Sequence, residues 1–256
     1  IYGMDKAIKV FGPGVTVPPG EMVFSGVKKM HDDIAASARP DLPLIVSEFS
    51  AGPVAGGERD SLYMGPWIAN VIRQCDGLAQ IMAFWPFSDV FEEHGVPDAP
   101  FSDHSAREGR GLIAPDGIPK PSYVAFALLH RLGNERIRNS ADDIILTKRA
   151  DGSLAIALWN FVGRDASGAD RTVRLDFRHI SPRAQAVVYR LDQSHENTLG
   201  AYRAMGSPAY PTPAQVQRLW RVARIRPAEE RTIEKNTLTI DLPPEGLAVV
   251  EVMKSR

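Results

Sequence analysis

The sequence of 256 residues is poor in cysteine, in net charge and in long apolar runs, and each shortage excludes a class of protein. Its single cysteine, Cys75, rules out an internal disulfide and a cysteine-rich metal site, and it stands in an apolar-periodic stretch typical of a core residue. The formal net charge of −1 gives no electrostatic reason to bind a nucleic acid. No apolar run reaches the length that crosses a bilayer, so we expect no membrane partner.

Sequence motifs for several common chemistries are also missing. The glycines of "AGPVAGG" (51–57) lack the Gly-Lys-Ser/Thr ending of a phosphate-binding loop, and the chain has no serine-hydrolase elbow. His94 and His104 lie in one loop without regular ligand spacing, so we expect no metal site and no cofactor. The chain opens at Ile1 in what reads as the middle of an element. This suggests that the natural start and any targeting segment lie upstream, which leaves the compartment open.

The first 135 residues alternate strand-like and helix-like patterns, which favours a parallel sheet or barrel. Two near-continuous apolar runs, "LPLIV" (42–46) and "GLAQIMAFW" (77–85), are typical of parallel strands buried on both faces. Helical spacing is found in three stretches: 25–37, 61–74 and 120–133. Their candidate N-terminal signals are Ser25, Asp60 and Pro121, and Gly133 suits the C-terminal cap of the third.

Beyond about residue 136 the pattern changes to short alternating strands separated by turn residues, which is typical of an antiparallel sandwich. A hairpin is predicted around Asp151-Gly152, and "NTLTIDLPPEGLAVVEV" (236–252) is predicted as a second strand pair. A helical insertion at 212–223 interrupts the strands, with Thr212 as its cap. Three arginines on one face of this insertion and just beyond it are predicted to form a solvated face: Arg218, Arg221 and Arg224.

These patterns divide the chain into residues 1–135 and 136–256. A complete eightfold α/β barrel needs roughly 250 residues by itself. The first part has room for two clear strands and the tail of a third at Ile1 to Gly3. Three strands cannot close a barrel and would leave apolar edges open. Either another segment completes the sheet, or the first part is a small open α/β domain.

The chemistry-bearing residues gather after the two predicted strands, where an α/β barrel builds its active site. The first strand runs into Glu48, and the second ends at Trp85. In "WPFSDVFEEHG" (85–95), acidic residues alternate with aromatic ones. Aromatic rings stack on sugars while carboxylates bind hydroxyls or act at the anomeric carbon, so this pattern indicates a carbohydrate site. The pattern is also compatible with a rim glutamate at Glu48, a core tryptophan at Trp85 and an exposed acidic pair at Glu92–Glu93.

Three stretches resemble the closing part of the barrel of glycoside hydrolase family 39, the β-xylosidases and α-L-iduronidases. They are "LPLIVSEFSAG" (42–52), "FSDVFEE" (87–93) and "GIPKPSY" (117–123). The similarity continues through "YRLDQSHENTLGAYRAMGSPAYPTPAQV" (189–216). The resemblance implies an α/β plus all-β fold. Residues 1–135 would be about the sixth to eighth strands of a (β/α)8 TIM barrel, and residues 136–256 an antiparallel β-sandwich with a helical insertion near 212–223.

The resemblance also implies roles for single residues. Glu48 matches the glutamate that ends strand seven, which is the nucleophile of the family. Trp85 matches the tryptophan that lines the subsite for the cleaved sugar. The residues that we therefore assign to sugar binding are Tyr2, Trp85, Phe91, Glu92 and Glu93.

Two departures from the family pattern stand out. "FSDHSAREGRGL" (101–112) replaces a His-Gly-Gly-Phe-like stretch, which alters the expected subsite. The general acid/base of the family is the glutamate of an Asn-Glu-Pro motif, and this sequence contains no such motif. Its Asn134-Glu135 pair follows the last predicted barrel helix and is in the wrong place.

The leading hypothesis is the C-terminal part of a retaining, β-xylosidase-like glycosidase. It would cleave terminal β-linked sugars from a xylo-oligosaccharide or β-xyloside by double displacement. We expect the chain alone to be inactive, and a homo-oligomer is compatible with its composition. The alternative is a non-catalytic carbohydrate-binding or assembly module, or one half of a split barrel. The upstream sequence discriminates between them, because an Asn-Glu-Pro motif there favours the enzyme.

Overall fold

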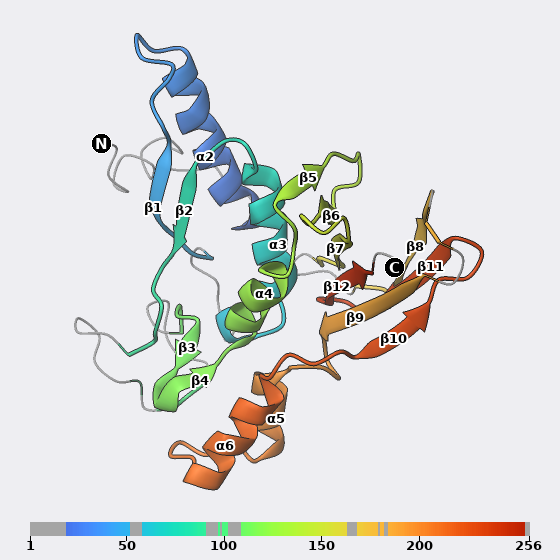
Figure 1. Ribbon diagram of the computed structural model, residues 1–256. Helices are drawn as coiled ribbons and strands as arrows, with labels where there is room; N and C mark the ends of the chain where they lie inside the picture. Colours follow the sequence, from blue (N-terminus) through green and yellow to red (C-terminus); the bar gives the residue numbers. More distant parts are fainter. Residues whose placement is uncertain are drawn as a thin grey trace.

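The structure, a computed structural model, describes residues 19–51, 58–90, 97, 99–101, 109–162, 168–178, 180–181 and 184–253 of the chain. Its first half contains two strands, β1 (Ile45–Phe49) and β2 (Ile81–Phe84), which pair in parallel. Helices α2 (Pro19–Ala35), α3 (Met64–Cys75) and α4 (Pro121–Leu129) lie beside them (Figure 1). The predicted alternation of helices with two parallel strands is therefore confirmed.

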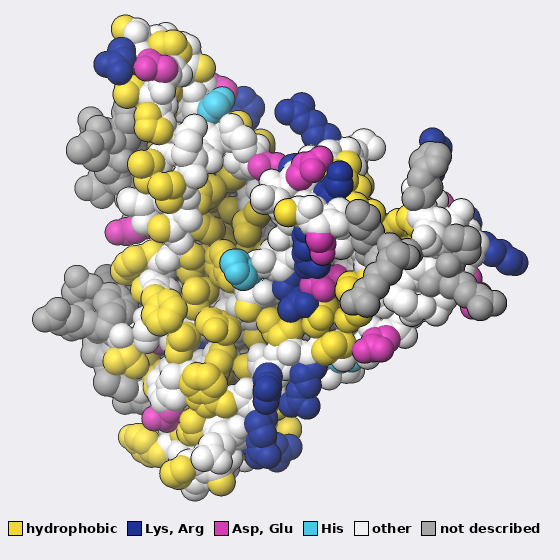
Figure 2. All heavy atoms as spheres, in the orientation of Figure 1, with side chains coloured by type: hydrophobic (Ala, Val, Ile, Leu, Met, Phe, Trp, Pro, Cys, Tyr) yellow, Lys and Arg dark blue, Asp and Glu magenta, His cyan; other side chains and the backbone are white. Residues whose placement is uncertain are grey.

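Only one face of the β1–β2 pair is covered by described residues. Val46, Met82 and Phe84 pack against the buried core beneath the helices. On the opposite face Ile45 is 55% exposed and Ile81 is 57% exposed. Figure 2 shows hydrophobic side chains gathered over this part of the surface. The prediction that both faces are buried is therefore wrong for the described part of the chain, because no described element packs on the second face.

Two of the predicted helix starts are wrong. α2 begins at Pro19, where a proline is favourable because the first helical N–H has no partner in any case, so Ser25 lies inside the helix. α3 begins at Met64, after a 3-10 turn over Glu58–Asp60, and the Asp60 side chain is buried rather than capping it. α4 does begin at Pro121 as predicted.

Gly133 lies beyond the end of α4, so its predicted role as the helix cap is wrong. The helix ends at Leu129. The Gly133 N–H donates to Thr147 Oγ1 at 2.7 Å, and a Cβ on Gly133 would come within 2.3 Å of the Lys148 carbonyl oxygen. The glycine therefore permits a close approach of two backbone segments.

The second half is built from antiparallel strands, as predicted. One sheet has six strands in the order β10-β9-β12-β7-β6-β5, and β8 (Arg171–Asp176) pairs separately with β11 (Thr237–Leu242). The strands of the larger sheet are β5 (Glu135–Ile137), β6 (Ile144–Lys148), β7 (Leu154–Trp159), β9 (Gln185–Leu191), β10 (Glu229–Thr232) and β12 (Leu247–Val252). The predicted hairpin joins β6 to β7, with Gly152 at φ 84° in its turn.

The predicted pairing within residues 236–252 is wrong, although both strands exist. β12 pairs with β7 and β9, whereas β11 pairs with β8 in the other sheet. The turn at Pro243–Gly246 therefore carries the chain from one sheet to the other. A local turn signal cannot distinguish this crossing from a hairpin, because both need the same turn residues.

The larger sheet is covered on both faces, which explains its continuous apolar strands. In β12, Leu247 and Val249 belong to the core shared with α3 and α4. The alternate residues Ala248 and Val250 belong to a second core shared with β8 and β11. This alternation follows from the period of two in a strand. The helices of the first half thus pack directly on the sheet of the second half.

A third, smaller core joins the helical insertion to the first half. The insertion contains α5 (Thr198–Ala204), which the sequence did not indicate, and α6 (Pro213–Val222), which it did. The predicted cap is confirmed, since Thr212 and Gln215 form a reciprocal capping box. Leu199 and Leu219 pack against Ile118, in the short hairpin of β3 (Ile113–Ala114) and β4 (Ile118–Pro119). α5 and α6 thus lie together at the lower end of the molecule in Figure 1.

Candidate active site

A β-bulge near the end of β1 determines where Glu48 points. Val46 pairs with Met82 and Phe49 pairs with Phe84, so one extra residue is accommodated in β1 between these pairs. Strict alternation from Val46 would turn Glu48 toward the helices and Phe49 away from them. With the bulge, Phe49 is buried and Glu48 is exposed. Bulges commonly re-aim a side chain beside an active site, and sequence reasoning missed this one.

Trp85 lies next to the end of β1. Its backbone N–H donates to the Phe49 carbonyl oxygen at 2.9 Å, and its side chain is half-buried. Phe49 and Phe84, the last residues of β1 and β2, meet edge to face with ring centroids 5.5 Å apart. The two predicted functional residues, Glu48 and Trp85, are therefore brought to the same edge of the parallel pair.

The other predicted sugar-binding residues lie outside the described residues: Tyr2, Phe91, Glu92 and Glu93. The same is true of His94 and His104. Asp89, in the same acidic and aromatic stretch, is described and is buried, with only 6% of its surface exposed. Its carboxylate therefore interacts with groups inside the protein and is not placed to bind a sugar hydroxyl.

Asp89 belongs to a buried group of charges that we call the Lys120 cluster, consisting of Lys120, Asp60 and Asp89. Lys120 precedes the first residue of α4 and has no exposed surface. Its ammonium group donates to Asp89 Oδ2 at 2.8 Å and to the Gly109 carbonyl oxygen at 2.8 Å, and it forms an ion pair with Asp60 Oδ1. Asp89 Oδ1 accepts from the Gly111 N–H at 2.5 Å.

The charges of the Lys120 cluster influence one another strongly because water is excluded. Burial raises the pKa of Asp60 from 3.8 to about 6, and the negative charge of Asp89 acts in the same direction. The two carboxylates raise the pKa of Lys120, despite burial acting in the opposite direction. Sequence reasoning missed this cluster. The available signal was Lys120 itself, a lone charge within the apolar stretch 117–129.

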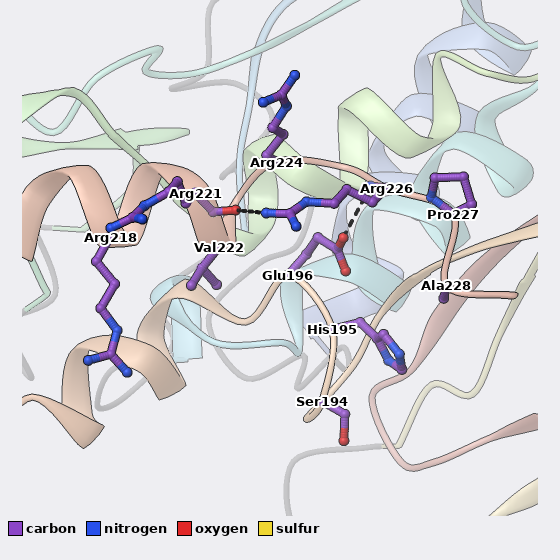
Figure 3. Close-up of a pocket in the computed structure, with 10 residues that line it drawn as sticks. All are labelled: Ser194, His195, Glu196, Arg218, Arg221, Val222, Arg224, Arg226, Pro227 and Ala228. Carbon is purple, nitrogen blue, oxygen red and sulfur yellow. Dashed lines mark hydrogen bonds between the residues drawn. The ribbon is translucent and has the colours of Figure 1, made fainter.

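A separate cavity of about 660 Å³ lies among residues of the helical insertion and the segment after it. Its lining includes the predicted basic face, Arg218, Arg221 and Arg224, which is exposed as expected. In Figure 3 the side chains of Arg218 and Arg224 point in different directions, and Arg226 donates to the Arg221 carbonyl oxygen. The guanidinium groups therefore do not converge on one position where an anion could bind.

The described residues contain no group of three or more His, Cys, Asp or Glu side chains that could hold a metal ion. Within the same ranges, no helix has the length and apolar character needed to cross a membrane. Cys75 is buried, as its apolar surroundings predicted, and burial raises the pKa of its thiol to about 11. A thiol with so high a pKa is a poor nucleophile at neutral pH.

Comparisons with known proteins agree with the resemblance. The profile described as glycosyl hydrolases family 39 matches residues 20–236. A β-xylosidase of Geobacillus stearothermophilus is 30% identical over 220 residues, which are 84% of this chain and 42% of that protein. Two β-xylosidase structures from Caulobacter crescentus are similar in fold. One, a monomeric enzyme of strain CB15, has a TM-score of 0.79 at 26% identity and covers 93% of this chain and 51% of its own.

The second structure, a family 39 β-xylosidase, has a TM-score of 0.73 at 29% identity and covers 98% of this chain and 54% of its own. The chain therefore spans about half the length of the relatives that it matches.

Proposed function

Because the chain belongs to glycosyl hydrolases family 39, we propose that it is the C-terminal part of a retaining, β-xylosidase-like glycoside hydrolase. In this proposal β1 and β2 are the last two strands of a TIM barrel, within a domain of residues 1–135. Residues 136–256 form a β-sandwich domain, in which β8 and β11 are the second layer. The exposed Ile45 and Ile81 would face the barrel interior, where the side chains of further strands would cover them.

The observation that carries the proposal is the bulge that exposes Glu48 beside Trp85. In a retaining glycosidase one carboxylate attacks the anomeric carbon, while a second carboxyl group about 5 Å away protonates the leaving oxygen. Glu48 would be the attacking group, since it stands at the carboxyl end of a strand, where barrels place their catalytic residues. Trp85 would stack on the sugar, together with Tyr2, Phe91, Glu92 and Glu93. The proton donor would come from an upstream part of the protein.

Replacement of Glu48 in the full-length protein tests this assignment. We expect Glu48→Gln to lower kcat for an aryl β-xyloside by a factor on the order of 10⁴ to 10⁶, as losses of a catalytic nucleophile do. In Glu48→Ala, added azide should restore part of the turnover by occupying the vacated position. A 2-deoxy-2-fluoro-xyloside should label the wild-type protein on the peptide that contains Glu48.

Ser47→Ala is the matched control, because Ser47 is exposed in the same bulge but carries no carboxylate. Its kcat should stay close to that of the wild type. Undiminished turnover in Glu48→Gln, or a label on another peptide, would remove Glu48 from the role of nucleophile.

One half of a split barrel is the second candidate, and the open face of β1 and β2 favours it. Exposed apolar side chains on one face of the β1–β2 pair are compatible with association with a chain that supplies the remaining strands. Addition of a chain that contains an Asn-Glu-Pro motif would then restore activity to residues 1–256. Activity restored only by covalent joining would favour a single longer enzyme.

A further inference from the structure

The Lys120 cluster lies where four separate segments of the chain meet. Asp60 ends the 3-10 turn that precedes α3, and Asp89 follows Trp85 in the segment after β2. Gly109 and Gly111 belong to the segment before β3, and Lys120 directly precedes α4. The ammonium group of Lys120 thus connects the chain that follows β1 with the chain that follows β2.

Each donor of the Lys120 ammonium group has a partner. Its three protons meet two carboxylates and one carbonyl oxygen. Lys120 and both aspartates are buried, and Gly109 is half-buried. Buried charges are tolerated when they are paired in this way, and removal of one partner leaves an uncompensated charge. Movement of Asp89 away from Lys120 would leave a buried charge without its partner. The ion pair therefore opposes movement of the segment that carries Asp89.

The segment between Trp85 and Asp89 is short and is held at both ends. Trp85 is bonded through its N–H to Phe49, and the Asp89 N–H donates to the Ile113 carbonyl oxygen at 2.8 Å. Phe87, in the middle, is 65% exposed, and its carbonyl oxygen accepts from the backbone N–H groups of Leu112 and Ile113, where β3 begins. Pro86 is also buried, but Asp89 is the charged side chain that anchors this segment in the interior.

We propose that Lys120 is a positioning residue, which fixes the segment from Trp85 to Asp89 and thereby fixes the position of the Trp85 ring near the end of β1, where Glu48 lies. The consequence for sugar binding rests on the proposed function, whereas the position of the ring is a property of this chain alone. Asp89, one of the acidic residues of the stretch 85–95, thus acts through Lys120 and not on a sugar.

The test follows the Trp85 side chain directly. The chain is labelled with 5-fluorotryptophan, and the ¹⁹F resonance of Trp85 is assigned by its loss in Trp85→Phe. In Lys120→Met we expect the Trp85 resonance to shift or broaden, while those of the buried Trp67 and Trp159 keep their positions. Hydrogen exchange at the Gly111 amide, which is bonded to Asp89, should become at least about tenfold faster, since each tenfold corresponds to about 1.4 kcal/mol of opening free energy.

Lys28→Met is the matched control. Lys28 forms an exposed ion pair with Asp32 on α2, so the same substitution removes an ammonium group at a site with little influence on structure. It should leave the Trp85 resonance and the Gly111 exchange unchanged. Asp89→Asn keeps the shape of the side chain but removes its charge, and it should affect Trp85 in the same selective way if Lys120→Met does not fold.

Two results would overturn the proposal. One is an unaltered Trp85 resonance in a folded Lys120→Met or Asp89→Asn chain. The other is an equal change at Trp67, Trp85 and Trp159, which would show a general loss of stability. Neither measurement uses a substrate, so a failure of Glu48 as nucleophile would leave this test unaffected.

Discussion

Asp60 should make the stability of the chain depend on pH in the sense opposite to that of most carboxylates. Its pKa is about 6 in the folded chain, compared with 3.8 for a free side chain. The folded chain therefore binds a proton more tightly than the unfolded chain does. The contribution of Asp60 to stability is largest below about pH 4, decreases as the pH rises to about 6, and is constant above that. At about 1.4 kcal/mol for each pH unit, the decrease amounts to about 3 kcal/mol.

Asp60→Asn isolates this contribution, because an amide does not titrate. The charged groups that act on Asp60 are Lys120, Asp89 and Arg59, and all remain in the variant. We expect the unfolding free energy of the variant, relative to wild type, to increase by about 3 kcal/mol between pH 4 and pH 7. Lost contacts shift this difference at every pH equally and do not affect its slope.

Urea unfolding followed by circular dichroism at closely spaced pH values measures this difference. Asp32→Asn provides a control of opposite sign, since Lys28 holds the pKa of the Asp32 carboxyl below its usual range. That control should lose stability relative to wild type at neutral pH but not in acid. A difference for Asp60→Asn that is flat with pH, or that falls as the pH rises, would refute the argument that burial dominates over the Lys120 charge.

Two further substitutions test the packing of α4 in the core and the N-terminal cap of α6. Leu128→Ala empties a fully buried position in α4 and should lower the unfolding free energy by about 2–5 kcal/mol, whereas the same change at the exposed Leu42 should cost well under 1 kcal/mol in the same urea titration. Thr212→Ala removes the capping box of α6 and should cost about 1 kcal/mol. Thr212→Ser keeps the hydroxyl and should retain most of the stability, so equal losses in both variants would exclude the cap as the cause.

Elements that depend on local sequence were predictable. The hairpin of β6 and β7 has its turn at Asp151-Gly152, and α6 has its cap and proline within one turn of its start. The side chains that decide these structures are neighbours in sequence, so one short stretch contains the whole signal. The two parallel strands were predictable for a similar reason, since each is a single apolar run.

Features that depend on distant partners were not predictable from the same patterns. Asp60 is of a residue type that commonly caps helices, yet its side chain pairs with Lys120, which lies far along the chain. Gly133 resembles a helix terminator, yet what requires a glycine is the nearby backbone of Lys148. In both cases the residue type suggested a helix end, and a contact with a distant part of the chain gave the residue a different role.

The bulge in β1 combines both kinds of information and shows why the end of this strand was difficult to interpret. An apolar run has no alternation, so nothing in "LPLIV" indicates which residues face the helices. The register is set instead by Val46 and Phe49, which both pack inward although three positions separate them. An odd separation is compatible with one buried face only if one residue is extra. The burial of Phe49 therefore requires the bulge, and the bulge in turn exposes Glu48.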